Sequence, residues 1–471
     1  MATIAERLAE YSVSNSLKGD KALAGAMRIY AFDTLAVLLA GTVAPSSAPV
    51  ARTILAAAGK PEATVAGVGK ATSAWDAALA NGAFAHALEL DDDHRVAVLH
   101  PGAVVVPAAF ASAEAEGCSG LTFLRALYVG YEVMCRLGEV FRGSQFHHGV
   151  HPTALCGVFG AAAAAAVTMD LDRDRFVQAL GIAGTQASGL TEWRADGSWI
   201  KRLHPGRAAQ SGILAARLAR EGFTGPATIF EGASGFFNAF SFGETIDPDV
   251  MTRALGTEHH ALGTAIKPYP CCRFEHGAVD LALAAHESGI AASNIEAASI
   301  RIYSTGVLTY HHRPKSAVDA QFNVPYAVAV ALLRGQIGLS DFTDEAIRNG
   351  DVLTLSDRVH VKEDPEFSAH YPDEYRVELE LLLKNGERCV SFSDCPSGDP
   401  AAARYRNEPR LFEQEVERKV GALLAETGYG DRTARLKSGV DALMDAPQVD
   451  ALSSILAKAA PAEATRLKAR A

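Results

Sequence analysis

Apolar residues recur three and four positions apart over roughly the first 260 residues, and this helical spacing limits the possible folds more than any other property of the sequence. Examples are Lys21–Gly41, Leu121–Phe141, Arg173–Gly184 and Gly206–Arg220. Alanine and leucine dominate these segments, and both residues favour helices. Because alanine and glycine leave little side-chain bulk between neighbouring helices, we expect a compact helical bundle rather than long coiled coils.

Signals for β-strands begin near Lys267. In Arg376–Leu383, apolar and charged residues alternate, as they do in a half-buried strand. Asn385-Gly386 follows directly, and Asn-Gly between two β-prone runs is a strong signal for a hairpin. Helical segments such as Pro325–Arg334 continue among the strands. The strand-like segments are Ser299–Tyr303, Arg358–Val361, Arg376–Leu383 and Arg388–Ser393.

The helical pattern returns from Leu411 to the end of the sequence. We therefore expect a mainly α protein in which a large all-helical domain, residues 1–263 and 405–471, is interrupted by a smaller α+β domain, residues 264–404. The length of 471 residues supports two domains, because it exceeds what one hydrophobic core usually serves. A cleft between two such domains is the usual place for a ligand.

The net charge of −11 disfavours a nucleic-acid partner, because proteins that bind nucleic acids carry a basic face. The longest uncharged apolar run, Ala154–Met169, is too short for a membrane span and predicts a closely packed core helix. The N-terminal segment lacks the apolar core of a secretory signal. Seven cysteines, an odd number, fit reduced thiols better than a disulfide framework. We expect a cytoplasmic protein that binds neither nucleic acid nor membranes.

Three of the 15 histidines directly precede a proline, namely His100, His151 and His204, although random placement would give only about 0.6 such pairs. A helical pattern follows each pair, so we expect each proline at the first helical position and each histidine at the N-cap. The exposed N–H groups and the dipole of a helix N-terminus attract carboxylates. The alternative is that His-Pro is only an extended dipeptide at a helix start.

The densest group of ionisable residues runs from His86 to His94 and contains Glu89 and Asp91–Asp93. Four carboxylates within five residues repel one another, so this segment is a poor helix interior and a candidate for the rim of a cleft. Three interpretations are open: a divalent-metal site, an acid/base site in which carboxylates orient His94 or His100, and a solvated acidic loop.

Two basic segments could hold an anionic ligand. Lys201 and Arg202 precede His204, and Lys267 opens a rigid Lys-Pro-Tyr-Pro turn near the expected domain boundary. A lysine in such a place can clamp a carboxylate or stabilise an enolate, although a single cation is more often a surface residue. The sequence motifs of nucleotide, flavin and zinc-protease chemistry do not occur. We therefore expect cofactor-free proton transfer on a small anionic molecule.

Six collinear segments together resemble the MmgE/PrpD family, which includes 2-methylcitrate dehydratase, cis-aconitate decarboxylase and iminodisuccinate epimerase. The resemblance implies a large helical domain and a smaller α+β lid domain, usually in a homodimer. It also implies a cofactor-independent site between the domains for a di- or tricarboxylate. The segments are HALELDDDH…LHPGA, VHPTALCGVFGAAAAAA, GTQASG, WIKRLHPGRAAQSG, KPYPCCRFEHGAVD and DAQFNVPYAVAVALL.

The resemblance further implies which residues are catalytic, and it implies no metal ligand. His100 and His151 match the family's site histidines and would form the proton-transfer pair. Lys201 and Lys267 would hold substrate carboxylates and stabilise an enolate-like intermediate. Tyr326 would donate a proton or orient the substrate, although by itself a tyrosine in an apolar helix is interpreted as a core aromatic.

The acidic segment departs from the family's common LDFDDT pattern. Glu89 replaces an Asp, Asp93 replaces a Thr, and Cys272 stands where some members have a His. These three residues, with Asp92 and Arg202, are our candidates for substrate binding, and Asp92 and Asp93 could instead tune a histidine. An extra carboxylate disfavours a wholly anionic substrate, but it could pair with an ammonium group.

We expect an enzyme that abstracts a proton α to a carboxylate without a cofactor, as a dehydratase-type lyase of the 2-methylcitrate dehydratase family. The first alternative is an epimerase of an amino- or imino-dicarboxylate, which Asp93 favours. The second alternative belongs to another class, a metal-dependent helical protein that uses Asp91–Asp93.

Overall fold

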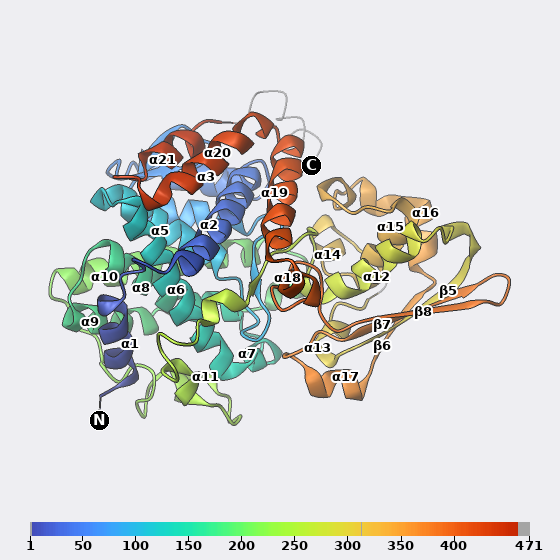
Figure 1. The fold of residues 1–471 in the computed structure, drawn as a ribbon, viewed down its shortest axis with the longest axis horizontal. Coiled ribbons are helices and arrows are strands. Elements are labelled where there is room, and N and C mark those ends of the chain that lie inside the picture. Colours follow the sequence, from blue (N-terminus) through green and yellow to red (C-terminus); the bar gives the residue numbers. More distant parts are fainter. Residues whose placement is uncertain (1, 312, 460–471) are drawn as a thin grey trace. The chain divides into compact units, whose positions relative to one another are not determined.

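Most of the chain forms α-helices, and the strands are gathered in one four-stranded sheet and two small two-stranded sheets (Figure 1). This computed structural model describes residues 2–311 and 313–459, so the last part of the expected C-terminal helical segment lies outside the described residues. The chain divides into two units, each described by itself. Unit 1 contains the residues up to Glu192, Ile200–Ala265 and the residues from Glu413 onward, and unit 2 contains Trp193–Trp199 and Ile266–Phe412.

The elements of unit 1 are mainly long helices. Its helices are α1 Ile4–Ser14, α2 Lys21–Gly41, α3 Ser47–Ala56, α4 Ala74–Ala85, α5 Gly102–Glu116, α6 Gly120–Phe141, α7 Ser144–His147, α8 Pro152–Thr168, α9 Arg173–Gly184, α10 Ile200–Arg220, α11 Phe236–Phe240, α20 Thr433–Asp441, α21 Asp450–Leu456 and, from Glu413 onward, α19 Pro409–Glu426. Its strands, which the sequence did not indicate, are β1 Ala63–Val65, β2 Lys70–Thr72, β3 Asp93–His94 and β4 Thr264–Ala265.

Unit 2 combines shorter helices with the larger sheet. Its helices are α12 His276–Glu287, α13 Ser304–Val307, α14 Ala317–Ala320, α15 Val324–Arg334, α16 Gly350–Ser356, α17 Pro365–His370 and α18 Ala403–Asn407. Its strands are β5 Ile295–Ile302, β6 Val359–Glu363, β7 Val377–Leu383 and β8 Arg388–Ser393. Short 3₁₀ helices in the chain are η1 Glu192–Arg194, η2 Pro248–Met251, η3 His260–Gly263, η4 Arg273–Glu275, η5 Ala292–Asn294, η6 Leu339–Asp341, η7 Ala346–Arg348, η8 Gly430–Arg432 and η9 Ala442–Met444. The fold is thus mainly α, with a smaller α+β region.

Helix α8 lies at the centre of unit 1, and every one of its residues is buried. It packs against α6 and α10, its neighbours in Figure 1. A Cβ atom added to Gly130 of α6 would lie 2.9 Å from the carbonyl oxygen of Gly160 in α8. A Cβ atom added to Gly212 of α10 would lie 2.4 Å from the Cβ atom of Ala161. Such approaches need glycine, so the expected close packing of helices is confirmed.

Helix α2 is long and apolar enough to cross a membrane by length and composition alone. However, 72% of its most apolar window is buried inside the protein. Because a core helix of a globular protein passes the same test, we interpret α2 as part of the interior of unit 1.

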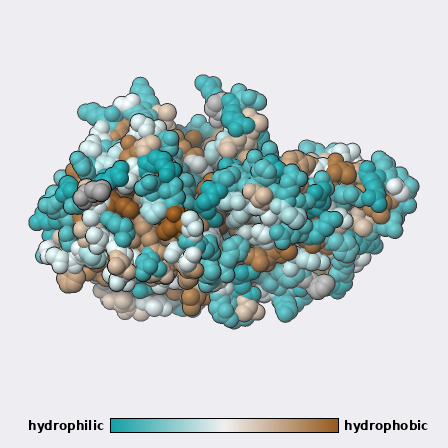
Figure 2. All heavy atoms as spheres, turned by 90° about the horizontal axis from the view of Figure 1, so that it is seen from below, coloured by the Kyte–Doolittle hydropathy of each residue, from teal (hydrophilic) through white to brown (hydrophobic). Residues whose placement is uncertain are grey.

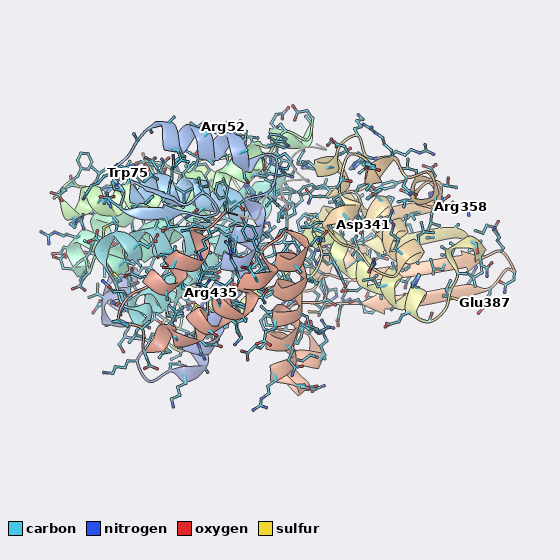
Figure 3. All side chains as sticks on the ribbon, turned by 90° about the horizontal axis from the view of Figure 1, so that it is seen from above. Arg52, Trp75, Asp341, Arg358, Glu387 and Arg435 are labelled. Atoms are coloured by element: carbon cyan, nitrogen blue, oxygen red, sulfur yellow. The ribbon has the colours of Figure 1, made fainter. Side chains whose placement is uncertain are left out.

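The sheet of unit 2 has the strand order β6-β5-β7-β8. Strand β5 runs parallel to β6 and antiparallel to β7, and β7 and β8 form an antiparallel hairpin. The expected alternation along β7 is confirmed, because Val377, Leu379 and Leu381 are buried while Glu378 is half-buried. Helices α12 and α15 cover one side of the sheet (Figure 1). The hairpin turns where the Asn-Gly signal predicted, and Glu387 lies at its tip (Figure 3).

Large hydrophobic side chains reach the surface in small groups. Figure 2 shows one face on which hydrophilic residues predominate and hydrophobic residues are scattered. Two of the exposed ones, Val390 and Phe392, share one side of the edge strand β8. The exposed large hydrophobic residues of the described chain are Val13, Leu190, Trp199, Ile200, Leu214, Phe223, Phe242, Leu262, Leu308, Val390 and Phe392.

The three His-Pro pairs occupy three different positions relative to their helices. His151 is the N-cap of α8 and Pro152 is its first residue, as predicted. His100 lies one position further out, because Pro101 is the N-cap of α5. For His204 the prediction is wrong, since α10 begins at Ile200 and Pro205 lies inside it. A helix tolerates proline near its start, where few N–H groups have a helical partner to lose.

Candidate active site

The acidic segment lies inside unit 1. Asp91 and Asp92 are fully buried, and Glu89 and Asp93 are nearly so. A carboxylate is stable in the protein interior only when its neighbours supply hydrogen bonds or positive charge. The interpretation of this segment as a solvated acidic loop is therefore wrong.

Asp92 is held by the start of one helix and the side of another. Its Oδ1 atom accepts a hydrogen bond from the backbone N–H of Gly102 in α5 at 2.8 Å, and its Oδ2 atom accepts one from the hydroxyl of Tyr131 in α6 at 2.7 Å. A Cβ atom on Gly102 would lie 2.6 Å from Oδ2, so the carboxylate approaches this closely only because the residue is glycine. Burial raises the pKa of the Asp92 carboxyl well above its ordinary value. Since both oxygens are occupied, Asp92 anchors the acidic segment to α5 and α6.

Asp91 joins two histidines. Its Oδ2 atom accepts a hydrogen bond from Nδ1 of His86, the C-cap of α4, at 2.7 Å, and it lies 3.5 Å from Nδ1 of His100. The Nδ1 atom of His100 also lies 2.7 Å from the carbonyl oxygen of Asp92, which can only accept. His100 therefore carries a proton on Nδ1, and in its neutral form it has a lone pair on Nε2. Its side chain is 12% exposed, whereas that of Asp91 is 0% exposed.

The same three residues meet the distance requirement of a metal site. His86, Asp91 and His100 each offer one ligand atom, and these atoms lie within 4.8 Å of one another. However, Nδ1 of His100 donates a hydrogen bond to a carbonyl oxygen, so this nitrogen does not offer a lone pair to an ion. The hydrogen-bonded arrangement thus favours the acid/base interpretation, while a metal role for Asp91–Asp93 stays a prediction.

His94, the other histidine considered for acid/base work, has a different setting. It lies in β3 beside β4, and its Nε2 atom donates to the carbonyl oxygen of His260 at 2.9 Å. Its Nδ1 atom accepts the backbone N–H of Ala97 at 3.2 Å. The Nε2 atom of His94 also lies 3.5 Å from Oε1 of Glu139. Both ring nitrogens of His94 thus have backbone partners, so we assign the acid/base role to His100. Asp93 also faces it, with 4.0 Å between Oδ1 and Nδ1 of His100.

A second pair of histidines adjoins the first. The Nδ1 atoms of His151 and His204 lie 3.0 Å apart, and the His151 ring stacks on that of His86 with 5.9 Å between centroids. The backbone N–H of His100 donates to Oγ1 of Thr153, in the first turn of α8, at 3.1 Å. The structure thus brings His100 and His151, the expected proton-transfer residues, into one buried cluster of four histidines.

Burial, together with basic neighbours, disfavours a positive charge on the second pair. Burial lowers the pKa of His151 well below its ordinary value, and the nearby His204, Lys201, His86 and His100 act in the same direction. Burial likewise lowers the pKa of His204 to about 4, with His86 and Lys201 contributing. At neutral pH both imidazoles are therefore uncharged.

Lys201 is paired with Glu89, the residue that departs from the family pattern. The Nζ atom of Lys201 lies 2.5 Å from Oε1 of Glu89, and both side chains are buried. Glu89 has φ of 55°, a left-handed conformation that turns the chain at the start of the acidic segment. The neighbouring Arg202 donates to Oγ of Ser46 at 3.1 Å. Burial lowers the pKa of Arg202.

The remaining candidates, Lys267, Cys272 and Tyr326, belong to unit 2. Lys267 is fully buried, and the backbone N–H of Cys272 donates to the carbonyl oxygen of Gln321 at 2.7 Å. The hydroxyl of Tyr326 donates to the carbonyl oxygen of Asp341, labelled in Figure 3, at 2.6 Å, and the side chain is fully buried. Burial raises the pKa of Tyr326. The catalytic and binding roles of these three residues stay predictions.

Lys419 supports the acidic segment, and it was not identified from the sequence. Its Nζ atom, from α19, donates to the carbonyl oxygen of Leu90 at 2.6 Å and lies 2.7 Å from Oδ1 of Asp33 in α2. Burial lowers the pKa of Lys419 and raises that of Asp33. Asp33, an acidic residue within the long apolar helix Lys21–Gly41, was a signal in the sequence for a buried cation.

The other missed residues were visible in motifs that had already been singled out. Asp91 and His86 lie in the acidic segment, and His204 belongs to the third His-Pro pair. What the sequence could not show is that the rings of His86 and His204 both lie in contact with that of His151, because these residues meet only in the folded chain.

Models of one protein family match both units of the chain. The MmgE/PrpD N-terminal domain matches residues 6–249, and the MmgE/PrpD C-terminal domain matches residues 269–441. The chain is 28% identical over 453 residues to the cis-aconitate decarboxylase-like protein oryM of Aspergillus oryzae, covering 90% of this chain and 91% of that protein.

Two further relatives carry different enzyme names. Identity to a cis-aconitate decarboxylase of Aspergillus terreus is 32% over 327 residues, or 64% of this chain and 66% of that protein. Identity to a 2-methylcitrate dehydratase of Salmonella typhimurium is 24% over 220 residues, or 45% of each chain. The relatives are thus named as decarboxylases and dehydratases. The chain belongs to the MmgE/PrpD family.

Proposed function

We propose that this protein is a cofactor-independent lyase that moves a proton at the carbon α to a carboxylate of a small di- or tricarboxylate. The observation that carries the proposal is the hydrogen bond from Nδ1 of His100 to the Asp92 carbonyl, which leaves a lone pair on Nε2. A neutral imidazole of this kind is a general base at neutral pH.

The carboxylates around His100 suit both directions of proton transfer. When Nε2 takes a proton from the substrate, the imidazolium that forms has Asp91 at 3.5 Å and Asp93 at 4.0 Å from Nδ1. These charges stabilise the cation, which can then return the proton as a general acid. Lys201 would stabilise the negative charge that develops on the substrate carboxylate as its α-proton leaves.

For the overall reaction we favour dehydration, in which base-assisted loss of the α-proton is followed by loss of water. The similarity to 2-methylcitrate dehydratases supports this choice. Decarboxylation is the second candidate, favoured by the similarity over 90% of this chain to a cis-aconitate decarboxylase-like protein. There the protonated histidine would protonate the carbanion left after carbon dioxide departs.

The extra carboxylates also favour a third outcome. If the same enolate-like intermediate is reprotonated on its other face, the product is an epimer. Glu89 and Asp93 add negative charge to the site, which suits a substrate that carries an ammonium or iminium group. An epimerase of an amino- or imino-dicarboxylate therefore stays the alternative.

One experiment separates these outcomes. The purified protein would be incubated in heavy water with 2-methylcitrate, cis-aconitate and amino-dicarboxylates, and each mixture followed by proton and carbon NMR. A new alkene signals dehydration, loss of one carboxyl carbon with deuterium uptake signals decarboxylation, and deuterium at an inverted α-carbon signals epimerisation. Absence of deuterium exchange and of any product across the whole panel would contradict the proposal.

A further inference from the structure

The contact between His151 and His204 requires one imidazole to donate to the other. The 3.0 Å separation of their Nδ1 atoms is a hydrogen-bond distance, and two lone pairs would repel each other there. Both rings are buried, with 4% and 8% of the residue exposed, so water does not compete freely for these nitrogens. Each neutral imidazole has only one N–H group.

The positions of the protons follow from this contact. The donor carries its proton on Nδ1 and therefore has a lone pair on Nε2. The acceptor has its lone pair on Nδ1 and therefore carries its proton on Nε2. The two Nε2 atoms are thus complementary, one a base and one an acid. Their roles exchange when the proton moves between the Nδ1 atoms, the donor's Nε2 atom gains a proton and the acceptor's Nε2 atom loses one.

The charged groups around His151 determine whether its ring can hold a positive charge. His86, His100 and Lys201 are the groups that act on His151 besides His204, and all of them are basic. Glu89 faces Lys201, and Asp91 faces His86 and His100, so the nearest carboxylates are engaged by those neighbours. A positive charge held on His151 is therefore unfavourable, and a mechanism that removes the charge from this ring is of advantage.

We propose that His204 is a positioning residue that acts through His151 by accepting its Nδ1 proton. In the resting pair His151 donates from Nδ1, and its Nε2 atom is a second base beside that of His100. As Nε2 binds a substrate proton, the Nδ1–H bond of His151 breaks and an N–H bond forms at Nδ1 of His204. His204 then carries the positive charge, and His151 is neutral with its proton on Nε2. The reverse shift accompanies return of the proton to the product. The use of the substrate proton rests on the proposed function.

The resting arrangement can be measured without any substrate. Protein labelled with ¹⁵N in histidine would be examined by long-range ¹H–¹⁵N correlation between pH 5.5 and 8, with the His151→Asn and His204→Gln variants for assignment. We expect His151 as the Nδ1–H form and His204 as the Nε2–H form, both uncharged throughout. Two Nε2–H rings, or a protonated His204 at pH 7, would overturn the proposal.

The proton transfer itself is tested with two amide variants. In His204→Asn the amide takes the place of Nδ1 and keeps a hydrogen bond to His151, but it cannot accept the proton. In His204→Gln the amide takes the place of Nε2, so the bond to His151 is lost as well. We expect kcat in the heavy-water assay to fall about 100-fold in both variants, with KM changed less than threefold.

The pattern of results separates a proton acceptor from a purely structural partner. If His204→Asn keeps the wild-type kcat while His204→Gln loses it, His204 only orients the ring and the proposal is overturned. A protein that is inactive on every substrate, yet shows the expected tautomers, contradicts the proposed function and not the paired imidazoles. If a variant fails to fold, the tautomers of the wild-type protein still decide.

Discussion

Four neighbouring histidines of unit 1, His86, His100, His151 and His204, form two pairs with opposite surroundings. His86 and His100 share the carboxylate of Asp91, so a proton gained by His100 is stabilised by a negative charge. His151 and His204 bond each other, and the groups that shift their pKa values are basic. Two residues with the same His-Pro sequence thus acquire different chemistry. The difference teaches that burial and neighbouring charge, not residue type, decide how well a histidine accommodates an added proton.

The largest effect should come from removing the base in the carboxylate-supported pair. In His100→Asn the amide can still donate to the Asp92 carbonyl from the place of Nδ1, but no group occupies the place of Nε2. We expect proton exchange in heavy water to slow by about 100- to 10,000-fold, with thermal stability near that of the wild type. A rate within threefold of the wild type would assign the base elsewhere.

The second prediction concerns Lys201, the cation that is paired with the buried carboxylate of Glu89. Lys201→Met should slow exchange by about 100- to 1,000-fold and lower the free energy of unfolding by about 3–5 kcal/mol, because Glu89 is left buried without its partner. The matched control is the double variant Glu89→Gln/Lys201→Met. Its free energy of unfolding is measured in urea, and its rate of proton exchange is measured in heavy water. The double variant should regain stability without regaining the rate. Recovery of both would mean that Lys201 serves only to neutralise Glu89.

Asp91→Asn removes the shared charge and keeps the shape. The amide oxygen can still accept from His86, but the charge-assisted hydrogen bond is lost, which should lower the free energy of unfolding by about 1.5–3 kcal/mol. Exchange should slow by about tenfold, since one pKa unit of stabilisation of the cation corresponds to about 1.4 kcal/mol. An unchanged exchange rate would show that Asp91 only holds His86.

The smallest expected effect is the pH dependence of the free energy of unfolding that comes from His204 in the His151–His204 pair. Because the folded pKa of His204 is lowered to about 4, the unfolded chain binds a proton below its ordinary pKa of 6.5 while the folded chain does not. The contribution of His204 to the free energy of unfolding is therefore lost as pH falls from 6.5 toward 4, by at most about 1.4 kcal/mol per pH unit.

The measurement compares urea unfolding of the wild type and of His204→Asn at pH 7.5 and pH 5. Using the difference between the two proteins cancels the opposite contribution of buried acids such as Asp92, whose pKa is raised. We expect the wild type to lose more stability than the variant on acidification. Equal losses would show that His204 titrates alike in both states.

Local sequence signals predicted the elements well where one segment decides its own structure. Arg173–Gly184 is helix α9 within the expected bounds, and the Asn-Gly hairpin joins the expected strands. The start of α10 was wrong because proline usually begins a helix, whereas packing here extends the helix one turn before Pro205. At Gly206 a Cβ atom would lie 2.1 Å from the carbonyl oxygen of Leu79, so contact with α4 fixes this part of α10.

The site was only partly predictable, because its electrostatics depend on residues far apart in the chain. The histidines and Lys201 followed from motifs. The burial of four carboxylates did not, since it depends on Gly102, Tyr131, His86 and Lys419, which come from other elements. Leu90 and Lys419 are 329 positions apart. From the local sequence alone, the four carboxylates repel one another, and a solvated loop was one of the open interpretations. In the folded chain, residues from other elements supply the hydrogen bonds and positive charge that allow these carboxylates to be buried.

The contact of Lys419 with Asp33 and Leu90 has a consequence for the order of assembly. On the ribosome, α2 and the acidic segment emerge long before α19. Until α19 is made, the Asp33 carboxylate has no lysine, and burying it would be costly. The nascent helical unit must therefore stay open or hydrated around this cluster, and the arrival of α19 is the step that allows it to close.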